Sequence, residues 1–131
     1  MSQENVDFVR ASFDVWNAGD MDAYGELFAT DIVSQPPPGW PEPGPFKGRE
    51  EVLRGFVHIR EAFDADMSEP VSDFVDAGDR VLVRLVWRGR GHGPAIPLEM
   101  SCVYTVGDDR MQRMKFFFDH AEALEAMGLR E

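Results

Sequence analysis

The stretch Met111–His120, with the sequence MQRMKFFFDH, decides the fold that we predict for this chain. Successive side chains of a β-strand point to opposite faces of a sheet, so the stretch divides into two sets by parity. Arg113 and Lys115 share one parity, which predicts that the other parity faces the interior. That inward set is Gln112, Met114, Phe116 and Phe118. We interpret the stretch as the last strand of a curved sheet, with Met114, Phe116 and Phe118 on the wall of a pocket.

The overall composition limits the classes of function. A chain of 131 residues, 44% of them apolar, is large enough for one domain with its own core, which we expect to span residues 1–131. The net charge of -11 repels phosphate, so neither nucleic acid nor an anionic membrane is expected as a partner. No apolar run reaches the length of a signal segment or membrane span. The single cysteine, Cys102, excludes an internal disulfide, and we expect a soluble cytoplasmic protein.

Three helices are predicted in the first half of the chain. The first begins at Ser2 and ends at Asn17-Ala18-Gly19, and apolar residues recur on one of its faces at helical spacing: Val6, Val9, Phe13 and Trp16. Asp20 caps a second, short helix whose inward residues are Tyr24, Leu27 and Phe28. A third helix covers residues 49–63 and has a buried line made of Val52, Phe56, Ile59 and Phe63.

A proline-rich segment, PPPGWPEPGPFKG at 36–48, separates a short predicted strand at 31–35 from the third helix. It holds six of the nine prolines, which exclude both a helix and a central strand. Trp40 and Phe46 give this loop apolar anchors. Two interpretations remain open: an ordinary connection whose aromatic residues close the edge of the core, or a rim over the pocket.

Antiparallel strands are predicted from residue 70 onward, at 71–76, 80–90 and 98–106. The strand at 80–90 alternates between an inward set, Val81, Val83, Leu85 and Trp87, and an outward set of arginines. Gly107-Asp108-Asp109 forms a turn into the last strand, and Asp119 caps a final short helix that ends at Gly128. The element order predicts an α+β domain with three N-terminal helices on a strongly curved, mainly antiparallel sheet.

Several local sequences carry a family resemblance: WNAGDMDAYGELFATDI at 16–32, PFKGREEV at 45–52 and FFDHAEALEAMGL at 117–129. They resemble the SnoaL-like branch of the nuclear transport factor 2-like superfamily over about residues 4–129. The resemblance implies a cone-shaped α+β fold. The superfamily includes ketosteroid isomerases, polyketide cyclases, limonene epoxide hydrolases, dehydratases and binding domains without activity, so the fold alone does not choose a function.

The acids that several of these enzymes use are missing at the matching positions. The resemblance places the tyrosine, the protonated acid and the carboxylate base of ketosteroid isomerase near Ser12, Cys102 and Pro36, and none of these can act in that way. Epoxide hydrolases and polyketide cyclases place an inward acid on the last strand, and the matching residue is about Phe116. We therefore expect a ligand pocket without the usual acid–base set.

The predicted contacts with a small apolar molecule are aromatic residues, one methionine and two polar handles. The polar handles are the Tyr104 hydroxyl and the Gln112 amide, which would orient the ligand. The full predicted set is Trp16, Tyr24, Phe28, Trp40, Trp87, Tyr104, Gln112, Met114, Phe116 and Phe118. For any one of them, packing in the core is an alternative explanation.

Four residues are candidates for catalysis: Tyr104, His58, Asp119 and His120. Asp119 is better explained as a helix cap, because a carboxylate that accepts backbone N–H groups is a poor base. His58 lies off the apolar stripe of its helix, and His120 begins the last helix. The histidines form no metal-binding pattern, so neither a metal nor another cofactor is expected.

The outward face of the sheet combines cations with apolar residues, among them Val86, Val103 and Phe117. This mixture predicts a homodimer through that face, with Glu99 paired to one of the arginines. Three functions remain open at this point: a domain that binds a small apolar or aromatic molecule, an isomerase, cyclase or hydrolase with a nonstandard acid–base set, and a protein-binding adaptor.

Overall fold

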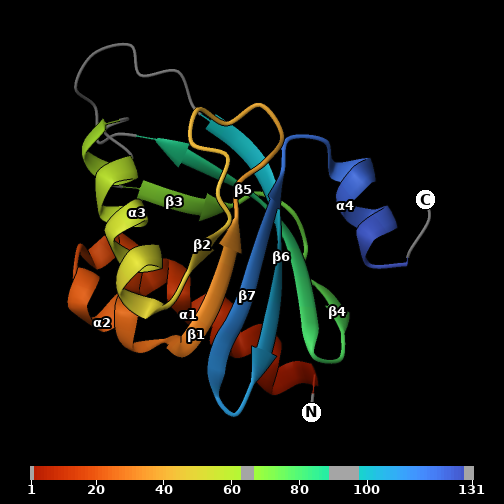
Figure 1. Cartoon of the computed structure of the whole chain (residues 1–131). Helices are drawn as coiled ribbons and strands as arrows, with labels where there is room; N and C mark the ends of the chain where they lie inside the picture. The colour runs from red at the N-terminus through yellow and green to blue at the C-terminus, as the bar shows by residue number, and fades with distance from the viewer. Residues whose placement is uncertain (1, 63–66, 89–97, 129–131) are drawn as a thin grey trace.

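The computed structural model describes residues 2–62, 67–88 and 98–128. These ranges contain four helices, α1 (Ser2–Ala18), α2 (Met21–Glu26), α3 (Arg49–Ala62) and α4 (His120–Ala126). They also contain seven strands (Figure 1): β1 (Phe28–Gln35), β2 (Phe46–Lys47), β3 (Met67–Pro70), β4 (Val75–Ala77), β5 (Arg80–Arg88), β6 (Leu98–Gly107) and β7 (Arg110–Phe117).

The strands form one curved sheet in the order β2-β1-β7-β6-β5-β3, and β4 pairs with β5 beside β3. All pairs are antiparallel except β1 with β7. The parallel pair places β1 beside β7, so the first and the last strand of the chain are neighbours inside the sheet (Figure 1). The predicted α+β fold with a mainly antiparallel sheet is confirmed.

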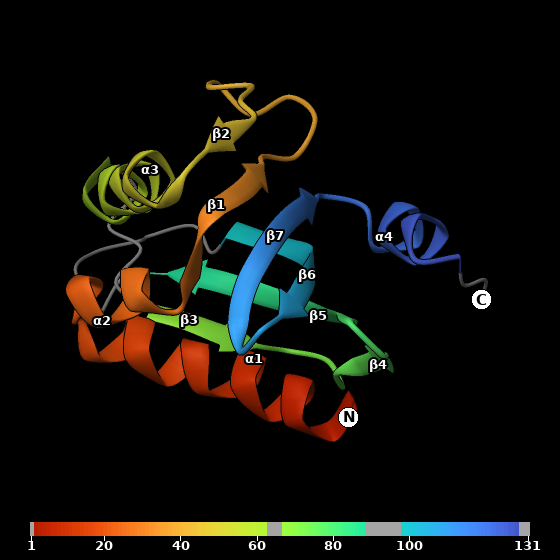
Figure 2. The same ribbon diagram turned by 60° about the horizontal axis from the view of Figure 1, so that its bottom comes forward.

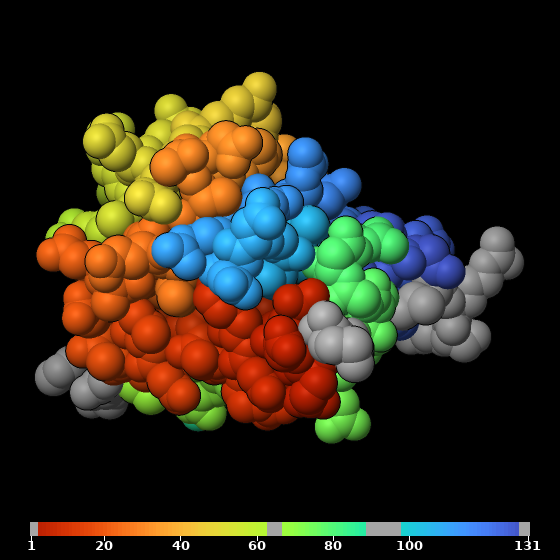
Figure 3. All heavy atoms as spheres, turned by 90° about the horizontal axis from the view of Figure 1, so that it is seen from below, coloured from red at the N-terminus to blue at the C-terminus, as the bar shows by residue number. Residues whose placement is uncertain are grey.

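Helices α1, α2 and α3 cover one side of the sheet, and the core lies between these helices and the sheet (Figure 2). The predicted face of α1 is buried as expected, with Val9 fully buried and Trp16 only 2% exposed. Seen from below, α1 lies next to the β6–β7 turn at one end of the molecule (Figure 3). Asp20 caps α2 as predicted, because its side chain accepts a hydrogen bond from the Ala23 N–H at 3.0 Å.

The predicted parity of β7 holds at its C-terminal half and fails at Gln112. Met114 and Phe116 are buried, and Arg113 and Lys115 are exposed. The pairing register shifts between Thr105–Arg113 and Val106–Met111, so that Gln112 is the extra residue of a β-bulge. The bulge leaves Gln112 exposed and turns Met111 inward, where it is fully buried. The prediction that Gln112 faces the pocket is therefore wrong.

Phe118 also departs from its predicted place on the pocket wall. Strand β7 ends at Phe117, and Phe118 lies in the bend that leads to α4 with 47% of its surface exposed. Its ring instead approaches Trp40 of the proline-rich loop, at 6.3 Å between ring centroids. The alternation of a strand no longer applies once the chain leaves the sheet, and this explains the error.

The strand predicted at 71–76 is replaced by two shorter ones, β3 and β4. Between them the hydroxyl of Ser72 accepts the Arg84 N–H at 2.9 Å, a bond that a strand carbonyl would otherwise accept. The chain therefore leaves the ladder there and rejoins it at Val75. The first strand begins at Phe28 rather than at Asp31. Phe63, the expected end of the buried line of the third helix, and residues 89–97, which include the predicted end of the strand at 80–90, lie outside the described residues.

Helix α4 packs on the outer face of the sheet, opposite the other helices (Figure 1). It covers Leu82, Val103 and Phe117, so these apolar residues are buried within the chain. Glu99 pairs with Arg84 at 3.5 Å, as predicted. Part of the apolar surface that motivated a homodimer is thus already covered, and the dimer stays a prediction. In the described part of the chain, no helix is long and apolar enough to cross a membrane.

Candidate ligand-binding site

A small apolar cavity lies between α3, the end of the sheet and the proline loop, by which we mean residues 36–45. We call it the outer cavity, and its volume is about 30 Å³. Its principal apolar side chains come from the proline loop, β2, α3, β5 and β7: Trp40, Phe46, Val52, Phe56, Trp87 and Phe116. Ser34 and Glu42 are the polar residues that line it among those described. The outer cavity is therefore an aromatic compartment with little polar surface.

Ring contacts hold the walls of the outer cavity in place. The Trp87 and Phe116 centroids are 5.7 Å apart, and the Phe56 ring meets Phe116 at 6.1 Å. Trp40 closes the cavity from the loop side and meets Trp87 edge to face at 6.5 Å. Offset and edge-to-face pairs of this kind add about 0.5–1.5 kcal/mol each beyond the burial of their area. Trp40 is partly exposed, and it lies in the proline loop rather than in a helix or strand.

Two open hollows flank the outer cavity on the surface. One, of about 430 Å³, shares Glu42, Phe46 and Gly55 with the cavity and also contains His58. The other, of about 410 Å³, shares Pro36, Pro37, Trp40 and Phe116 with it. Only a few side chains of the proline loop, α3 and β7 therefore separate the outer cavity from solvent.

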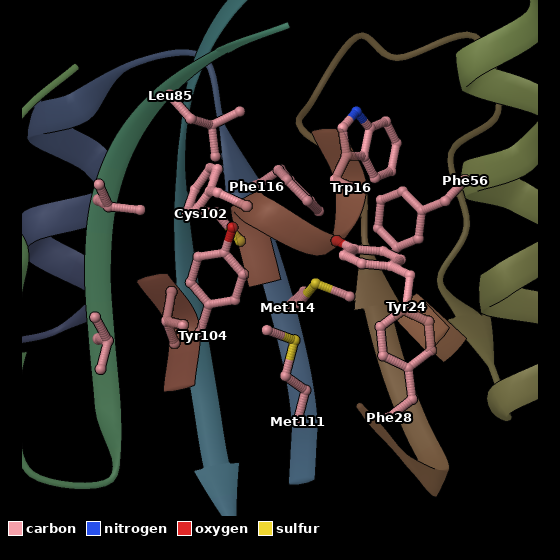
Figure 4. Packing of buried hydrophobic residues seen from close by; sticks show 14 of the residues in the cluster. Trp16, Tyr24, Phe28, Phe56, Leu85, Cys102, Tyr104, Met111, Met114 and Phe116 are labelled. Carbon is pink, nitrogen blue, oxygen red and sulfur yellow. The ribbon is translucent and has the colours of Figure 1, made fainter. Parts of the chain in front are cut away.

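A second void, the inner cavity, lies deeper and measures about 10 Å³. Trp87 and Phe116 line both cavities and so form the partition between them. Four hydroxyl groups line the inner cavity, each on a residue at most 6% exposed: Ser12, Ser68, Tyr24 and Tyr104. Figure 4 shows the phenol oxygens of Tyr24 and Tyr104 turned towards the middle of the cluster. The inner cavity is thus small, buried and polar.

Different elements bring these hydroxyls together. Ser12 lies on α1 and donates to the Val9 carbonyl at 2.5 Å. Ser68 is fixed by Asn17, whose side-chain oxygen accepts the Ser68 N–H at 2.7 Å and whose amide donates to the Ser68 carbonyl at 2.9 Å. The two amide bonds join β3 to the end of α1 and thereby place Ser68 beside the cavity.

Burial controls the chemistry of the buried acidic groups here. Desolvation raises the pKa of the Tyr24 phenol, and it raises the pKa of Tyr104 and of the Cys102 thiol well above their ordinary values. Tyr104 and Cys102 also share a hydrogen bond. All three groups therefore stay protonated near neutral pH, and Tyr104, a candidate for catalysis, is placed to hydrogen-bond but not to act as a base.

The structure brings six of the ten predicted contact residues to the two cavities. Trp40 lines the outer cavity; Trp16, Tyr24 and Tyr104 line the inner one; Trp87 and Phe116 line both. Phe28 and Met114 are fully buried but line neither cavity, so they serve the core. Gln112 and Phe118 are exposed.

The three remaining catalytic candidates lie outside both cavities. Asp119 caps α4 by accepting the Ala121 N–H at 2.9 Å, and the Nδ1 atom of His120 lies 2.7 Å from the hydroxyl of Ser101, at the outer face of the sheet. The side chain of His58 is 64% exposed, with Nε2 4.0 Å from Oε1 of Glu42. Among the described residues, no group of three or more His, Cys, Asp or Glu could hold a metal ion.

Sequence reasoning missed several cavity residues. Phe56 was predicted as buried, but only the observed packing of α3 against the loop places it in the outer cavity. Ser34 lies two residues after buried Ile32 on β1 and so shares its face of the strand, a signal that could have marked Ser34 as inward. Ser12 occupies the position that matches a family tyrosine, and nothing in its own sequence context marks it as a cavity residue. Ser68 lies outside any strand that the sequence predicted, so no signal pointed to it.

The chain belongs to the SnoaL-like domain family, whose model matches residues 9–114. This assignment confirms the resemblance found in the sequence. No curated protein matches the chain.

Solved structures agree with the fold. A protein from Sinorhizobium meliloti that is provisionally assigned as a polyketide cyclase shares 29% identity, with a TM-score of 0.70 over 88% of this chain and 98% of that one. TerC, co-crystallised with polyporic acid, shares 20% identity, with a TM-score of 0.73 over 95% of this chain and 98% of that one. A nuclear transport factor 2-like protein of unknown function from Burkholderia pseudomallei shares 22% identity, with a TM-score of 0.70 over 94% of this chain and 96% of that one.

Proposed function

We propose that this protein binds a small, flat apolar or aromatic molecule in the outer cavity. The observation that carries the proposal is the ring-lined wall formed by Trp40, Phe56, Trp87 and Phe116 between α3 and the proline loop. Ligand sites are typically concave and apolar with a few polar groups, and Ser34 and Glu42 are those groups here.

Binding requires the outer cavity to open. A cavity on the order of 150 Å³ holds benzene, whereas this one offers about 30 Å³. Displacement of Trp40 would join the cavity to the hollow of about 410 Å³ beside it. Trp40 is partly exposed and belongs to the loop rather than to the sheet, so it is the side chain that we expect to move. The proline loop is then the rim of the site.

Gly55 provides a sharp test of the outer cavity. It lies on α3 and lines the cavity, and a Cβ added there meets nothing within 4 Å. Because Gly55 also lines the open hollow beside the cavity, Gly55→Phe should place a phenyl ring at the cavity mouth and block entry, while Gly55→Ala is the matched control. Titration with naphthalene, followed by tryptophan fluorescence, should show binding to the wild type and to Gly55→Ala and its loss in Gly55→Phe. Equal binding by Gly55→Phe, or none by the wild type, would overturn the proposal.

A second candidate is an enzyme of the polyketide cyclase type. The 29% identity to the Sinorhizobium meliloti protein favours it, together with one pair of side chains at the cavity mouth. Ring closure of a polyketide requires a base that removes a proton from a carbon next to a carbonyl group. Glu42 lines the outer cavity, and His58 lies 4.0 Å from its carboxylate. Glu42 is thus the candidate base, and His58 is its candidate positioning residue.

The enzyme hypothesis can be tested without knowledge of the natural substrate. In D₂O, the protein should accelerate exchange of the methyl hydrogens of 2-acetylnaphthalene, which proton NMR detects directly. Glu42→Gln should abolish the acceleration, while binding of the ketone, measured by fluorescence, persists. Exchange no faster than in buffer, or full activity in Glu42→Gln, rules out this role for Glu42.

A further inference from the structure

We infer that the inner cavity is a subsite for a neutral oxygen acceptor, and that the ligand of the outer cavity is an aromatic ketone. This inference rests on the proposed binding function and adds the polar group that the ligand carries. It depends on four buried hydroxyl groups, on their hydrogen bonds and on the absence of a charged side chain among the described residues that line the inner cavity.

Two of the hydroxyls are donors without an acceptor. Tyr24 is 6% exposed and Ser68 is 4% exposed, and within the described part of the chain neither hydroxyl makes a hydrogen bond. Buried polar groups are nearly always paired, and an unpaired buried donor is costly. A protein that keeps two such donors at one void gains stability when an acceptor enters it.

The other two hydroxyls already have partners. Ser12 donates its proton to the Val9 carbonyl, and Tyr104 is hydrogen-bonded to Cys102. The donors that face an incoming group are therefore those of Tyr24 and Ser68, and they select an acceptor atom. Of common ligand groups, a carbonyl oxygen accepts two such bonds through its two lone pairs.

The dimensions of the inner cavity limit what enters it. A void of about 10 Å³ has room for little more than one oxygen atom or one water molecule. No described residue that lines it is charged, and the nearby Arg60 guanidinium, which acts electrostatically on the Tyr24 phenol, is held at the ring and the carbonyl of Trp16. A carboxylate in the void would lose its hydration without a cation in the lining to pair with. The subsite therefore favours a neutral ketone over an acid.

The partition explains how one molecule can occupy both cavities. Trp87 and Phe116 each line the outer and the inner void. Trp87 is fixed by its parallel stack on Trp16, with centroids 5.7 Å apart, so Phe116 is the ring that we expect to turn aside. The aromatic part of the ligand then replaces contacts with Phe116, and its carbonyl oxygen reaches Tyr24 and Ser68.

The test compares two probes of nearly equal shape, 2-acetylnaphthalene and 2-ethylnaphthalene, which differ by the carbonyl oxygen. The wild type should bind the ketone roughly tenfold more tightly than the hydrocarbon, as one buried hydrogen bond implies. Tyr24→Phe should remove this preference and leave the affinity for 2-ethylnaphthalene unchanged. Ser101→Ala is the control: it removes a buried hydroxyl that lies outside both cavities, beside His120, and should keep the preference.

The outcomes separate the inference from the proposed function. If the wild type binds both probes equally, the inner cavity holds water or nothing, and the ketone subsite is rejected while the apolar site stands. If it binds neither probe, both are rejected. A preference that survives in Tyr24→Phe, or one that is lost equally in Ser101→Ala, rejects Tyr24 as the donor. Thermal unfolding of each variant, followed by circular dichroism, confirms that it is folded.

Discussion

The indole rings of Trp16 and Trp87 lie parallel to within 3°, with their centroids 5.7 Å apart. Trp16 belongs to α1 and Trp87 to the end of β5, so the stack joins a helix to the sheet. The guanidinium of Arg60 lies 4.9 Å from the centroid of the Trp16 ring and donates to the Trp16 carbonyl at 2.9 Å, which adds α3 to the same contact. The pair is therefore where α1, α3 and the sheet meet.

Trp16→Ala should lower the free energy of unfolding by about 3–5 kcal/mol, because it leaves a large void in a closed core. Urea denaturation followed by circular dichroism measures the change. Trp40→Ala is the control: Trp40 is partly exposed, so its loss should reduce stability much less. Equal losses in the two variants would show that the stack does not organise the core.

The buried phenols and thiol predict a loss of stability at high pH. In the unfolded chain, Cys102 releases its proton near its ordinary pKa of 9.0 and the tyrosines near 10.0. In the folded protein burial raises all three pKa values, so the protons are retained. Above pH 9 the unfolded state binds fewer protons than the native state, and its free energy falls relative to the native state.

The stability should therefore be constant between pH 7 and about 8.5 and then fall, by up to about 1.4 kcal/mol per pH unit for each group. Cys102→Ala removes the group that titrates first, so its decline should begin nearer pH 10. The comparison concerns the shape of the two curves, because the substitution itself alters stability. Superimposable shapes would mean that Cys102 is not the source.

Alternation of side chains along a strand could predict which residues of the sheet face inward, because it depends only on position within that strand. Arg113 and Lys115 point outward, and Met114 and Phe116 point inward, as the alternation requires. The rule failed where the backbone departs from regular pairing, at the bulge residue Gln112 and at Phe118 beyond the strand end. A bulge depends on the register with the neighbouring strand, which a single stretch of sequence does not encode.

The candidate site was predictable only in part for a related reason. Its aromatic residues are large and apolar, so composition and spacing marked them as inward. The donors of the inner cavity are different, because Ser12 lies on α1, Tyr24 on α2, Ser68 on β3 and Tyr104 on β6. Their meeting is a property of tertiary packing, in particular of the Asn17 amide that fixes β3 to α1.

Asp119 distinguishes a structural carboxylate from a catalytic one. Because it accepts the Ala121 N–H as the cap of α4, Asp119→Ala should lower the free energy of unfolding by about 1 kcal/mol. Asp119→Asn, which keeps an oxygen acceptor, should retain most of the stability. Both variants should bind naphthalene as the wild type does. A loss of naphthalene binding with unchanged stability would show that Asp119 takes part in binding and is not only a helix cap.

The β6–β7 turn holds strain that a single substitution should relieve. Asp108 and Asp109 both have left-handed backbones, with φ of 52° and 58°. Two-residue hairpin turns of this kind favour Asp or Asn followed by Gly, because glycine has no Cβ to clash. Asp109→Gly should therefore raise the free energy of unfolding by roughly 0.5 kcal/mol, since the relief exceeds the entropy that glycine adds to the unfolded chain. Asp109→Val, whose branched side chain disfavours a positive φ, should lower it instead, by about 1 kcal/mol or more. Chemical denaturation of the two variants tests the turn, and a more stable valine variant would contradict the left-handed geometry at Asp109.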